Sequence, residues 1–356
     1  MYKLDYDYLI NILKGKDIDK DYIVKDYYSL LGFILVNKIG GYFYNQCLKF
    51  DIKLPKQIQS ALFLTYSSYK VRNNILRKFI FKLSYELETK HINHAFLKGS
   101  ILSNSYLLDY KTCIYDIGER VSNDIDILIS ASDLTKVEKI LTKLNFKQGY
   151  YDYKKNKIIL FSRKEIINRR INRGETAPFI LKTSNKIVPF IEIDLNFSVN
   201  ETANDTLSNK LLNNTIAYLS IKNTYIRSLS KYDFVIFLIM HAYKEMNVLF
   251  MIKHNKDLLL YKFLDLYLLL KDINLLTLYN LIVEYNIEKE AKLVIQATAI
   301  LFKCEALTNY LNNFNYDEKL IIKDYENKKN YIFTNSIQER ILNFNNLKYL
   351  KEIDYE

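Results

Sequence analysis

The chain has 356 residues and a formal net charge of +11, with 49% apolar and 26% charged residues, an ordinary globular composition that excludes a disordered or fibrous protein. The whole basic excess lies in residues 1–200, which hold 32 Lys and Arg against 21 Asp and Glu, whereas residues 201–356 hold 19 of each. This asymmetry indicates an acidic partner such as a nucleoside triphosphate or a nucleic acid, although the Lys-, Asn- and Tyr-rich usage is equally typical of A+T-biased coding.

The first 90 residues are expected to be helical. Apolar residues recur at intervals of three and four in Tyr8–Leu13 and again in Ile75–Leu83, which is the period of an amphipathic helix. Gly40–Gly41 and Pro55 break the pattern and separate the expected helices.

A strand, a tight turn and the start of a helix are predicted next. His94–Leu97 is a short apolar run, Lys98-Gly99-Ser100 forms the turn, and Ile101–Leu108 resumes helical spacing. A helix N-terminus presents unpaired N–H groups to an anion, Gly99 lets a phosphate approach the backbone, and Ser100 adds a hydroxyl donor. The turn is therefore a candidate phosphate-binding element.

Two aspartates mark the following predicted strand, Asn123–Ile129. Side chains at i and i+2 of a strand point to the same side, so Asp124 and Asp126 are placed to hold one cation between them. Their hard oxygen ligands suit Mg²⁺, which takes few carboxylates and completes its coordination with water and substrate phosphates. The alternative is that both aspartates are only the polar face of an edge strand.

The middle of the chain continues as mixed α/β structure. Ser132–Asp133 is expected to cap a helix over Leu134–Leu144, and strands are expected over Phe146–Tyr153, over Lys157–Ser162 and within Lys186–Val199.

A third acidic position lies on the last of these strands. The segment Ile191–Phe197 alternates cleanly between apolar and polar residues, with Glu192 and Asp194 on one face. A carboxylate on a strand beside Asp124 and Asp126 would complete a site for two metal ions, and either residue fits that role.

Basic residues are concentrated between the two acidic strands, within Lys154–Arg173. A segment that overhangs the site would attract an anionic acceptor or RNA. The other interpretation is a solvated basic hairpin and loop.

The C-terminal part is expected to be mostly helical. The last Gly is Gly174 and the last Pro is Pro189, so 167 residues follow without either helix breaker. Helical periodicity extends from Asp205 onward and includes Lys231–Phe250 and Asp257–Leu270.

Two residues of this part are candidate ligands for a substrate. His241 and Lys244 lie three apart on one predicted helix and share a face, from which they would reach a triphosphate or its acceptor. Lys244 suits phosphate, whereas His241 is equally well interpreted as a core histidine bonded to a neighbour such as Asp265.

These elements predict an α+β protein with a helical N-terminal region over 1–90, an α/β core over 91–200 and a helical C-terminal domain over 201–356. The three cysteines are far apart and lack C-x-x-C spacing, so we expect neither a disulfide framework nor a thiolate zinc site. Charges throughout the N-terminus and the shortness of the apolar runs argue against secretion and membrane insertion. A reduced, cytoplasmic protein is expected.

The order of Gly-Ser, Asp-x-Asp and a further acidic strand resembles that of the nucleotidyltransferases with a polymerase-β-like fold. More narrowly, the chain is similar to an uncharacterised nucleotidyltransferase branch common in bacteria, at Leu97-Lys98-Gly99, Arg120 and Asp124-Ile125-Asp126-Ile127-Leu128. Later segments similar to that branch are Glu192–Leu195, Leu238–Lys244 and Asp265–Leu269. The likeness covers roughly residues 90–270, with Asp109–Glu119 as an apparent insertion.

The resemblance implies a mixed-sheet nucleotidyltransferase core flanked by helical regions, and a reaction that depends on Mg²⁺, with Mn²⁺ as an alternative. Asp124 and Asp126 would hold the metal against the triphosphate of ATP or another NTP, while Gly99 and Ser100 would bind its terminal phosphates.

The resemblance also implies roles for two further residues. Asp194 would complete the second metal site and assist deprotonation of an acceptor hydroxyl. It is preferred over Glu192 because its position before Leu195 fits the branch. Arg120 would neutralise phosphate charge or, alternatively, orient one of the paired aspartates through an ion pair.

The expected activity is transfer of a nucleoside monophosphate from an NTP to a hydroxyl of a small molecule or peptide, with release of pyrophosphate. One alternative is transfer to tRNA or to a protein side chain, as in toxin-like relatives of the superfamily. The other is a non-catalytic nucleotide-binding protein, against which the intact acidic positions argue.

Overall fold

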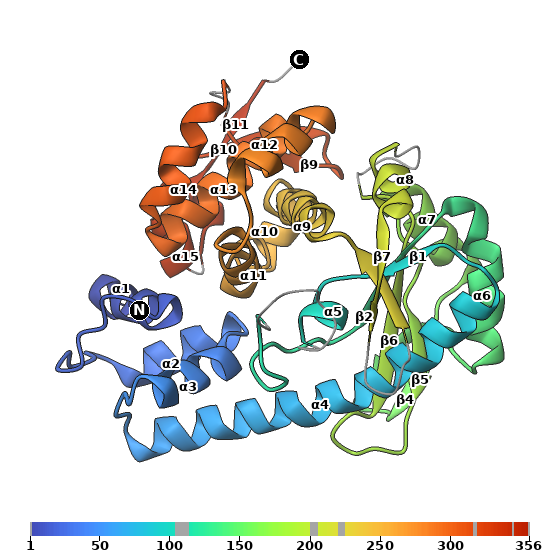
Figure 1. Ribbon diagram of the computed structural model, residues 1–356, viewed down its shortest axis with the longest axis horizontal. Helices are drawn as coiled ribbons and strands as arrows, with labels where there is room; N and C mark the ends of the chain where they lie inside the picture. The colour runs from blue at the N-terminus through green and yellow to red at the C-terminus, as the bar shows by residue number, and fades with distance from the viewer. Residues whose placement is uncertain are drawn as a thin grey trace. The chain divides into compact units, whose positions relative to one another are not determined.

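The computed structural model describes residues 2–103, 114–199, 206–219, 225–315, 319–343 and 345–354. The chain folds into two compact units (Figure 1). We call Leu64–Phe234 the central unit, and Met1–Phe63 together with Val235–Glu356 the split unit. The chain passes from one unit to the other within α4 (Lys56–Thr89) and returns within α9 (Lys231–Met246).

A six-stranded mixed sheet forms the centre of the central unit (Figure 1). Its strands are β1 (His94–Phe96), β2 (Ile125–Ile129), β3 (Lys147–Asp152), β4 (Lys157–Leu160), β5 (Phe179–Lys182) and β6 (Phe190–Asn196). Their spatial order is β1-β2-β6-β5-β3-β4, in which β2 and β6 are parallel and all other neighbours antiparallel. The parallel pair needs a long crossover connection, which the segment between β2 and β6 supplies.

Helices and a hairpin complete the central unit. The helices are α5 (Gly99–Leu102), α6 (Leu134–Lys143), α7 (Arg163–Arg173), α8 (Thr206–Asn213) and most of α4, and the hairpin pairs β7 (Thr215–Leu219) with β8 (Tyr225–Leu229). Helix α4 buries Leu76, Ile80, Leu83 and Leu87, a stripe at the spacing of one helix face. The Ser228 hydroxyl on β8 donates to the Phe96 carbonyl at 2.7 Å, which ties the hairpin to β1.

The two acidic strands pack differently into this unit. All five residues of β2 are buried, so both of its faces are covered. On β6 the side chains of Ile191, Ile193 and Leu195 are buried, whereas the alternate polar residues are half-buried. Because successive side chains of a strand point to opposite faces, the acidic residues of β6 share one face of the sheet.

The split unit is mainly helical and also contains a three-stranded antiparallel sheet in the order β11-β10-β9. Its N-terminal helices are α1 (Lys3–Lys14), α2 (Tyr27–Val36) and α3 (Gly40–Lys49). The C-terminal segment supplies α10 (Leu249–Lys253), α11 (Leu260–Leu270), α12 (Leu275–Glu284), α13 (Glu288–Phe302), α14 (Glu305–Tyr310) and α15 (Ile337–Leu342), with β9 (Ile322–Asp324), β10 (Lys329–Phe333) and β11 (Leu350–Ile353). Leu249, Ile252 and Ile322 form a buried cluster that joins α10 to this sheet.

The α+β class and the mixed sheet are confirmed, as are the N-terminal helices and the strands at His94, Asp126, Gln148, Ile158 and Asp194. The described part of the predicted Ile101–Leu108 helix consists of the last two residues of α5 and Ser103. The rest of that helix and the start of the apparent insertion, through Cys113, lie outside the described residues. Cys47 and Cys304 are free thiols. The three-domain division at 90 and 200 stays a prediction.

Five strands, β7 to β11, interrupt the helical periodicity that was expected from Asp205 onward. The expectation took Gly and Pro as necessary for tight turns. Here Asn255, Asn286, Lys303 and Lys328 adopt positive φ of 51°, 53°, 47° and 54°. Asn tolerates this left-handed conformation best among non-glycine residues, so the chain turns without glycine.

Two smaller expectations also differ from the structure. Asp133 makes no side-chain cap to α6; instead, the Ser130 hydroxyl accepts from the Ser132 amide at the start of a short 3₁₀ turn. Strand β5 was not expected, because Phe179–Lys182 is too short to show a clear period.

No single helix within the described ranges is long and apolar enough to cross a bilayer. The pair α11 and α12 meets the length and composition requirement only jointly, across a bend of 114°.

Candidate functional site

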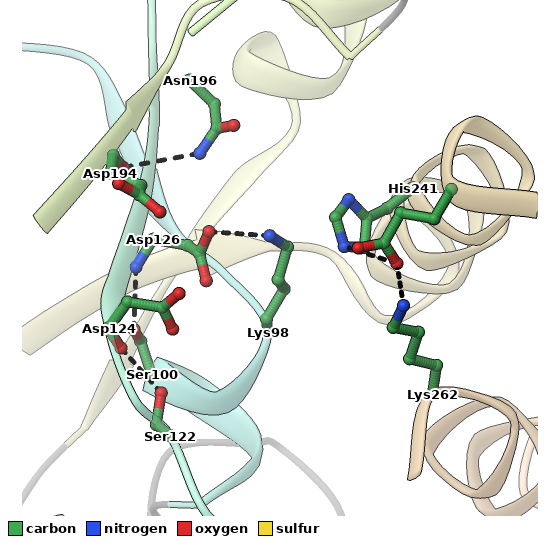
Figure 2. A network of polar contacts seen from close by, with 10 residues as sticks. Lys98, Ser100, Ser122, Asp124, Asp126, Asp194, Asn196, His241 and Lys262 are labelled. Carbon is green, nitrogen blue, oxygen red and sulfur yellow. Dashed lines mark hydrogen bonds and ion pairs between the residues drawn. The ribbon is translucent and has the colours of Figure 1, made fainter. Parts of the chain in front are cut away.

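Three carboxylates meet on the two acidic strands. The parallel register pairs Asp126 on β2 with Asp194 on β6, and Asp124 lies one residue before β2. One carboxylate oxygen from each of the three lies within 4.8 Å of the others (Figure 2). Glu192 shares the face of Asp194, but among the described residues only the three aspartates form this group.

Burial and neighbouring charges raise the pKa values of Asp126, Asp194 and Glu192. Burial raises the pKa of Asp126 to about 7, with further contributions from Asp124 and Glu175, and Lys98 opposes the shift. Burial, followed by the charges of Asp124, Asp126 and Glu192, raises the pKa of Asp194 well above its ordinary range. Burial also raises the pKa of Glu192 to about 7.

The donor set fits a divalent cation. Hard oxygen ligands converge within bonding reach of a common point, and their mutual repulsion is what a bound cation would relieve. Asp124, Asp126 and Asp194 are therefore the residues that could hold a divalent cation.

Lys98 lies in the site. The sequence places it in the Leu97-Lys98-Gly99 motif but predicts no role for its side chain. Its Nζ lies 2.7 Å from Oδ1 of the buried Asp126 (Figure 2). Its backbone has φ 47° and ψ −129°, a conformation that side-chain-bearing residues rarely adopt. The turn that this conformation makes ends β1 and starts α5.

Gly99 and Ser100 are both buried, and both support the segment that carries the aspartates. A Cβ at Gly99 would lie 2.6 Å from Ser122 Oγ and 2.8 Å from Ser122 Cβ, so glycine is required for this close approach. The Ser100 hydroxyl accepts a hydrogen bond from the Asp126 amide at 3.2 Å. Their binding of terminal phosphates stays a prediction.

Arg120 is buried, and its guanidinium donates to the Val121 carbonyl. Its own carbonyl accepts bonds from Asn73 Nδ2 and Ser103 Oγ, both at 2.7 Å. A different guanidinium, that of Arg72 on α4, interacts electrostatically with Asp124 and Glu192. Arg72 lies far upstream of the acidic strands and belongs to no motif. The nucleotide-binding role of Arg120 stays a prediction.

His241 and Lys244 lie on the part of α9 that belongs to the split unit. His241 Nε2 is 3.4 Å from a Glu245 oxygen, and the same carboxylate forms an ion pair with the buried Lys262 on α11 (Figure 2). The His241 ring stacks on Phe237 at 6.1 Å between centroids. His241 is thus held by its own helix and by α11, and the substrate contacts of both residues stay predictions.

The basic segment forms the β3–β4 hairpin and helix α7, rather than a hairpin followed by a loop. A Ser162 and Glu165 capping box starts the helix. Arg169 lies over the Phe161 ring at 4.7 Å, and Arg170 pairs with Glu138. Among the side chains of the segment that the structure describes, five basic ones are exposed, namely Lys154, Lys155, Lys157, Arg163 and Lys164.

Comparisons with known proteins place the chain in a family. A search of solved structures matches the crystal structure of an antigenic nucleotidyltransferase-like protein from Paracoccidioides brasiliensis, at 14% identity and a TM-score of 0.37, over 67% of this chain and 92% of that chain. A search of curated proteins gives no significant match. Residues 26–303 match the family described as uncharacterised nucleotidyltransferase, a range that holds all three clustered aspartates. Since that match covers most of the chain and agrees with the motifs at Leu97, Asp124 and Asp194, the chain belongs to the uncharacterised nucleotidyltransferase family.

Proposed function

We propose that the protein is a Mg²⁺-dependent enzyme that transfers a nucleoside monophosphate from an NTP, such as ATP, to a hydroxyl of a small molecule or peptide. Membership of the family supports generic nucleotidyl transfer and implies a nucleotide substrate. The proposed metal dependence and the roles of the aspartates are supported by one observation. Asp124, Asp126 and Asp194 converge within 4.8 Å, and the pKa values of Asp126 and Asp194 lie above their ordinary range.

The chain's own residues supply the positions that the reaction needs. In this proposal Asp124 and Asp126 hold the cation, which when bound would neutralise charge on the triphosphate and on the leaving pyrophosphate. Gly99 and Ser100 line the approach of the terminal phosphates, and Arg120 adds positive charge for them.

Asp194 has a second role in the proposed reaction. Its raised pKa suits a group that accepts the proton of the acceptor hydroxyl. The hydroxyl oxygen then attacks the α-phosphorus, the bond between the α-phosphorus and the oxygen bridging to the β-phosphate breaks, and pyrophosphate leaves.

Three substitutions test the proposal. We expect Asp124→Asn, Asp126→Asn and Asp194→Asn each to lower nucleotide transfer by on the order of 10³-fold or more, because each removes a ligand charge from a group that acts as a unit. The measurement is pyrophosphate release from each labelled NTP in the presence of Mg²⁺ and candidate acceptors. Circular dichroism of each variant is the check that it folds. Asp133→Asn, outside the cluster at the start of α6, is the matched control. Full activity of the Asp194 variant would move the third role to Glu192.

An anionic acceptor is the second candidate. The five exposed basic side chains of the β3–β4 hairpin and α7 lie beside exposed aromatic residues, Tyr150 at 50% and Tyr153 at 70% exposure. Such a surface favours a polynucleotide such as tRNA. Label from the NTP that appears on RNA would support this acceptor class. Label on a protein side chain would support a protein acceptor instead, and nucleotide binding without turnover would support a non-catalytic protein.

A further inference from the structure

The positions of two of the three aspartates follow from the sheet, whereas that of the third does not. Asp126 and Asp194 face each other across the parallel ladder of β2 and β6, so backbone hydrogen bonds fix their separation. Asp124 precedes the first paired residue, Ile125. Something other than the sheet must therefore hold Asp124 against the other two.

The long helix α4 supplies the missing support through Asn73. This side chain is 1% exposed, and its amide donates to the carbonyls of Ile117 and Arg120, both at 2.7 Å. Its oxygen accepts from the Ser122 amide at 3.3 Å. One buried side chain thus bonds three backbone groups of the segment that leads to Asp124.

The preceding residue of α4 bonds the next part of the same segment. Arg72 Nε donates to the Ser122 carbonyl at 2.9 Å, and Nη2 donates to the Asn123 carbonyl at 2.7 Å. The planar guanidinium presents both donors in a fixed fork, which an ammonium group cannot do. The second of these carbonyls belongs to the residue directly before Asp124.

Packing adds to these bonds. A Cβ at Gly118 would lie 2.6 Å from the Tyr66 ring of α4, so the segment lies directly on the helix. At its other end the Ser122 hydroxyl donates to the Asp124 carbonyl at 2.7 Å, and Gly99 packs against Ser122. The segment is held on both sides.

We propose that Arg72 and Asn73 are positioning residues, through which α4 holds Asp124 in reach of the cation bound by Asp126 and Asp194. This inference rests on the proposed metal role of the three aspartates. It assigns a role in the site to a helix whose sequence shows only amphipathic periodicity.

The charge of Arg72 allows the inference to be tested by the sign of an effect. A positive charge near three carboxylates opposes cation binding, so if Arg72 acts only through its charge, Arg72→Gln binds Mn²⁺ more tightly than wild type and Arg72→Lys binds it equally. If Arg72 positions Asp124, both variants bind Mn²⁺ more weakly, by about 10-fold, as for other residues that orient metal ligands.

The experiment compares wild type, Arg72→Lys, Arg72→Gln and Lys70→Gln by calorimetric titration with Mn²⁺ alone, with the thermal unfolding of each metal-free protein as the folding check. Lys70 is exposed on the same helix, so Lys70→Gln removes an equal charge without touching the segment. Wild-type affinity in Arg72→Lys, or tighter binding in Arg72→Gln, overturns the inference.

Amide hydrogen exchange over residues 117–124 provides a readout that needs no metal. We expect faster exchange there in Arg72→Lys and in Asn73→Ser than in wild type, and unchanged rates in Lys70→Gln. Unchanged exchange rates in Arg72→Lys and Asn73→Ser overturn the inference. If the Asp→Asn variants nevertheless lose activity, the proposed function stands without it. If wild type binds no Mn²⁺, the metal part of the proposed function fails, and the exchange rates alone decide whether α4 holds the segment.

Discussion

At the scale of single residues, the turn after β1 combines two unusual positions. Lys98 adopts a positive φ of 47°, which costs about 1–3 kcal/mol for a residue with a side chain. In this conformation the Lys98 ammonium lies 2.7 Å from the buried Asp126 carboxylate. The ion pair supplies the positive partner that this buried carboxylate needs. Gly99 follows directly and allows the Ser122 segment to approach.

We expect Gly99→Ala to destabilise the metal-free protein by about 1–3 kcal/mol, since its Cβ would overlap Ser122 Oγ and Cβ. The second change Ser122→Gly should recover part of this loss, because it removes both atoms and leaves only the Ser122 Cα at 3.2 Å. Urea unfolding of the two single variants and the double variant measures the coupling. Wild-type stability of Gly99→Ala, or additive effects in the double variant, would contradict the close approach.

At the scale of elements, the register of β2 against β6 creates the acidic site. A shift of one residue would turn Asp194 to the opposite face of the sheet. The observed register pairs it with Asp126 instead. Burial, followed by the charge of Asp124, raises the pKa values of both carboxyl groups above their ordinary range, and the charge of Asp126 adds to the shift of Asp194.

This register predicts how stability depends on pH. In the folded protein Asp126 has a pKa of about 7, against an ordinary value of 3.8, so between these values the folded state holds a proton that the unfolded chain has released. The free energy of unfolding in a chelator should therefore fall as pH rises through this window, by up to about 1.4 kcal/mol per pH unit for one proton.

Urea unfolding at several pH values, in the presence of a chelator, measures this slope. The groups that act on Asp126 are Lys98, which lowers its pKa, and Asp124 and Glu175, which raise it. We expect Asp126→Asn or saturating Mg²⁺ to flatten the slope, and Asp133→Asn to leave it unchanged. An unaltered slope in Asp126→Asn would show that other groups cause the dependence.

At the scale of the whole molecule, the unit that contains the site is larger than the predicted core. The central unit begins at Leu64, within α4, and ends at Phe234, after the β7–β8 hairpin. Helix α4 buries an apolar stripe and bonds the segment before Asp124, and β8 is bonded to β1. Both additions support strands that carry or flank the acidic site.

We expect a fragment of residues 64–234 to unfold cooperatively and to bind Mn²⁺, and a fragment of residues 91–200 to do neither, because the shorter fragment lacks α4 and the β7–β8 hairpin. Denaturant unfolding followed by circular dichroism, together with Mn²⁺ titration, compares the two. Cooperative unfolding of the shorter fragment would instead support the boundaries at 90 and 200.

The sequence by itself determined the chemistry of the site, because strand periodicity is a local property. The i and i+2 spacing of Asp124 and Asp126, and the alternation around Asp194, were sufficient to predict a shared face and a metal-binding donor set. The motif at Leu97-Lys98-Gly99 and the acidic strands were also sufficient to predict the family, which is confirmed.

Only the tertiary structure decided what holds those residues in place. The pairing of β2 with β6, the ion pair of Lys98 with Asp126, and the bonds from Arg72 and Asn73 join positions far apart in the chain, and no local period encodes such contacts. One turn between the strands missed after Asp205 has a related cause: Lys328, between β9 and β10, adopts a positive φ of 54° that composition alone does not mark. Local pattern therefore specified which groups form the acidic site, and long-range packing specified where they lie.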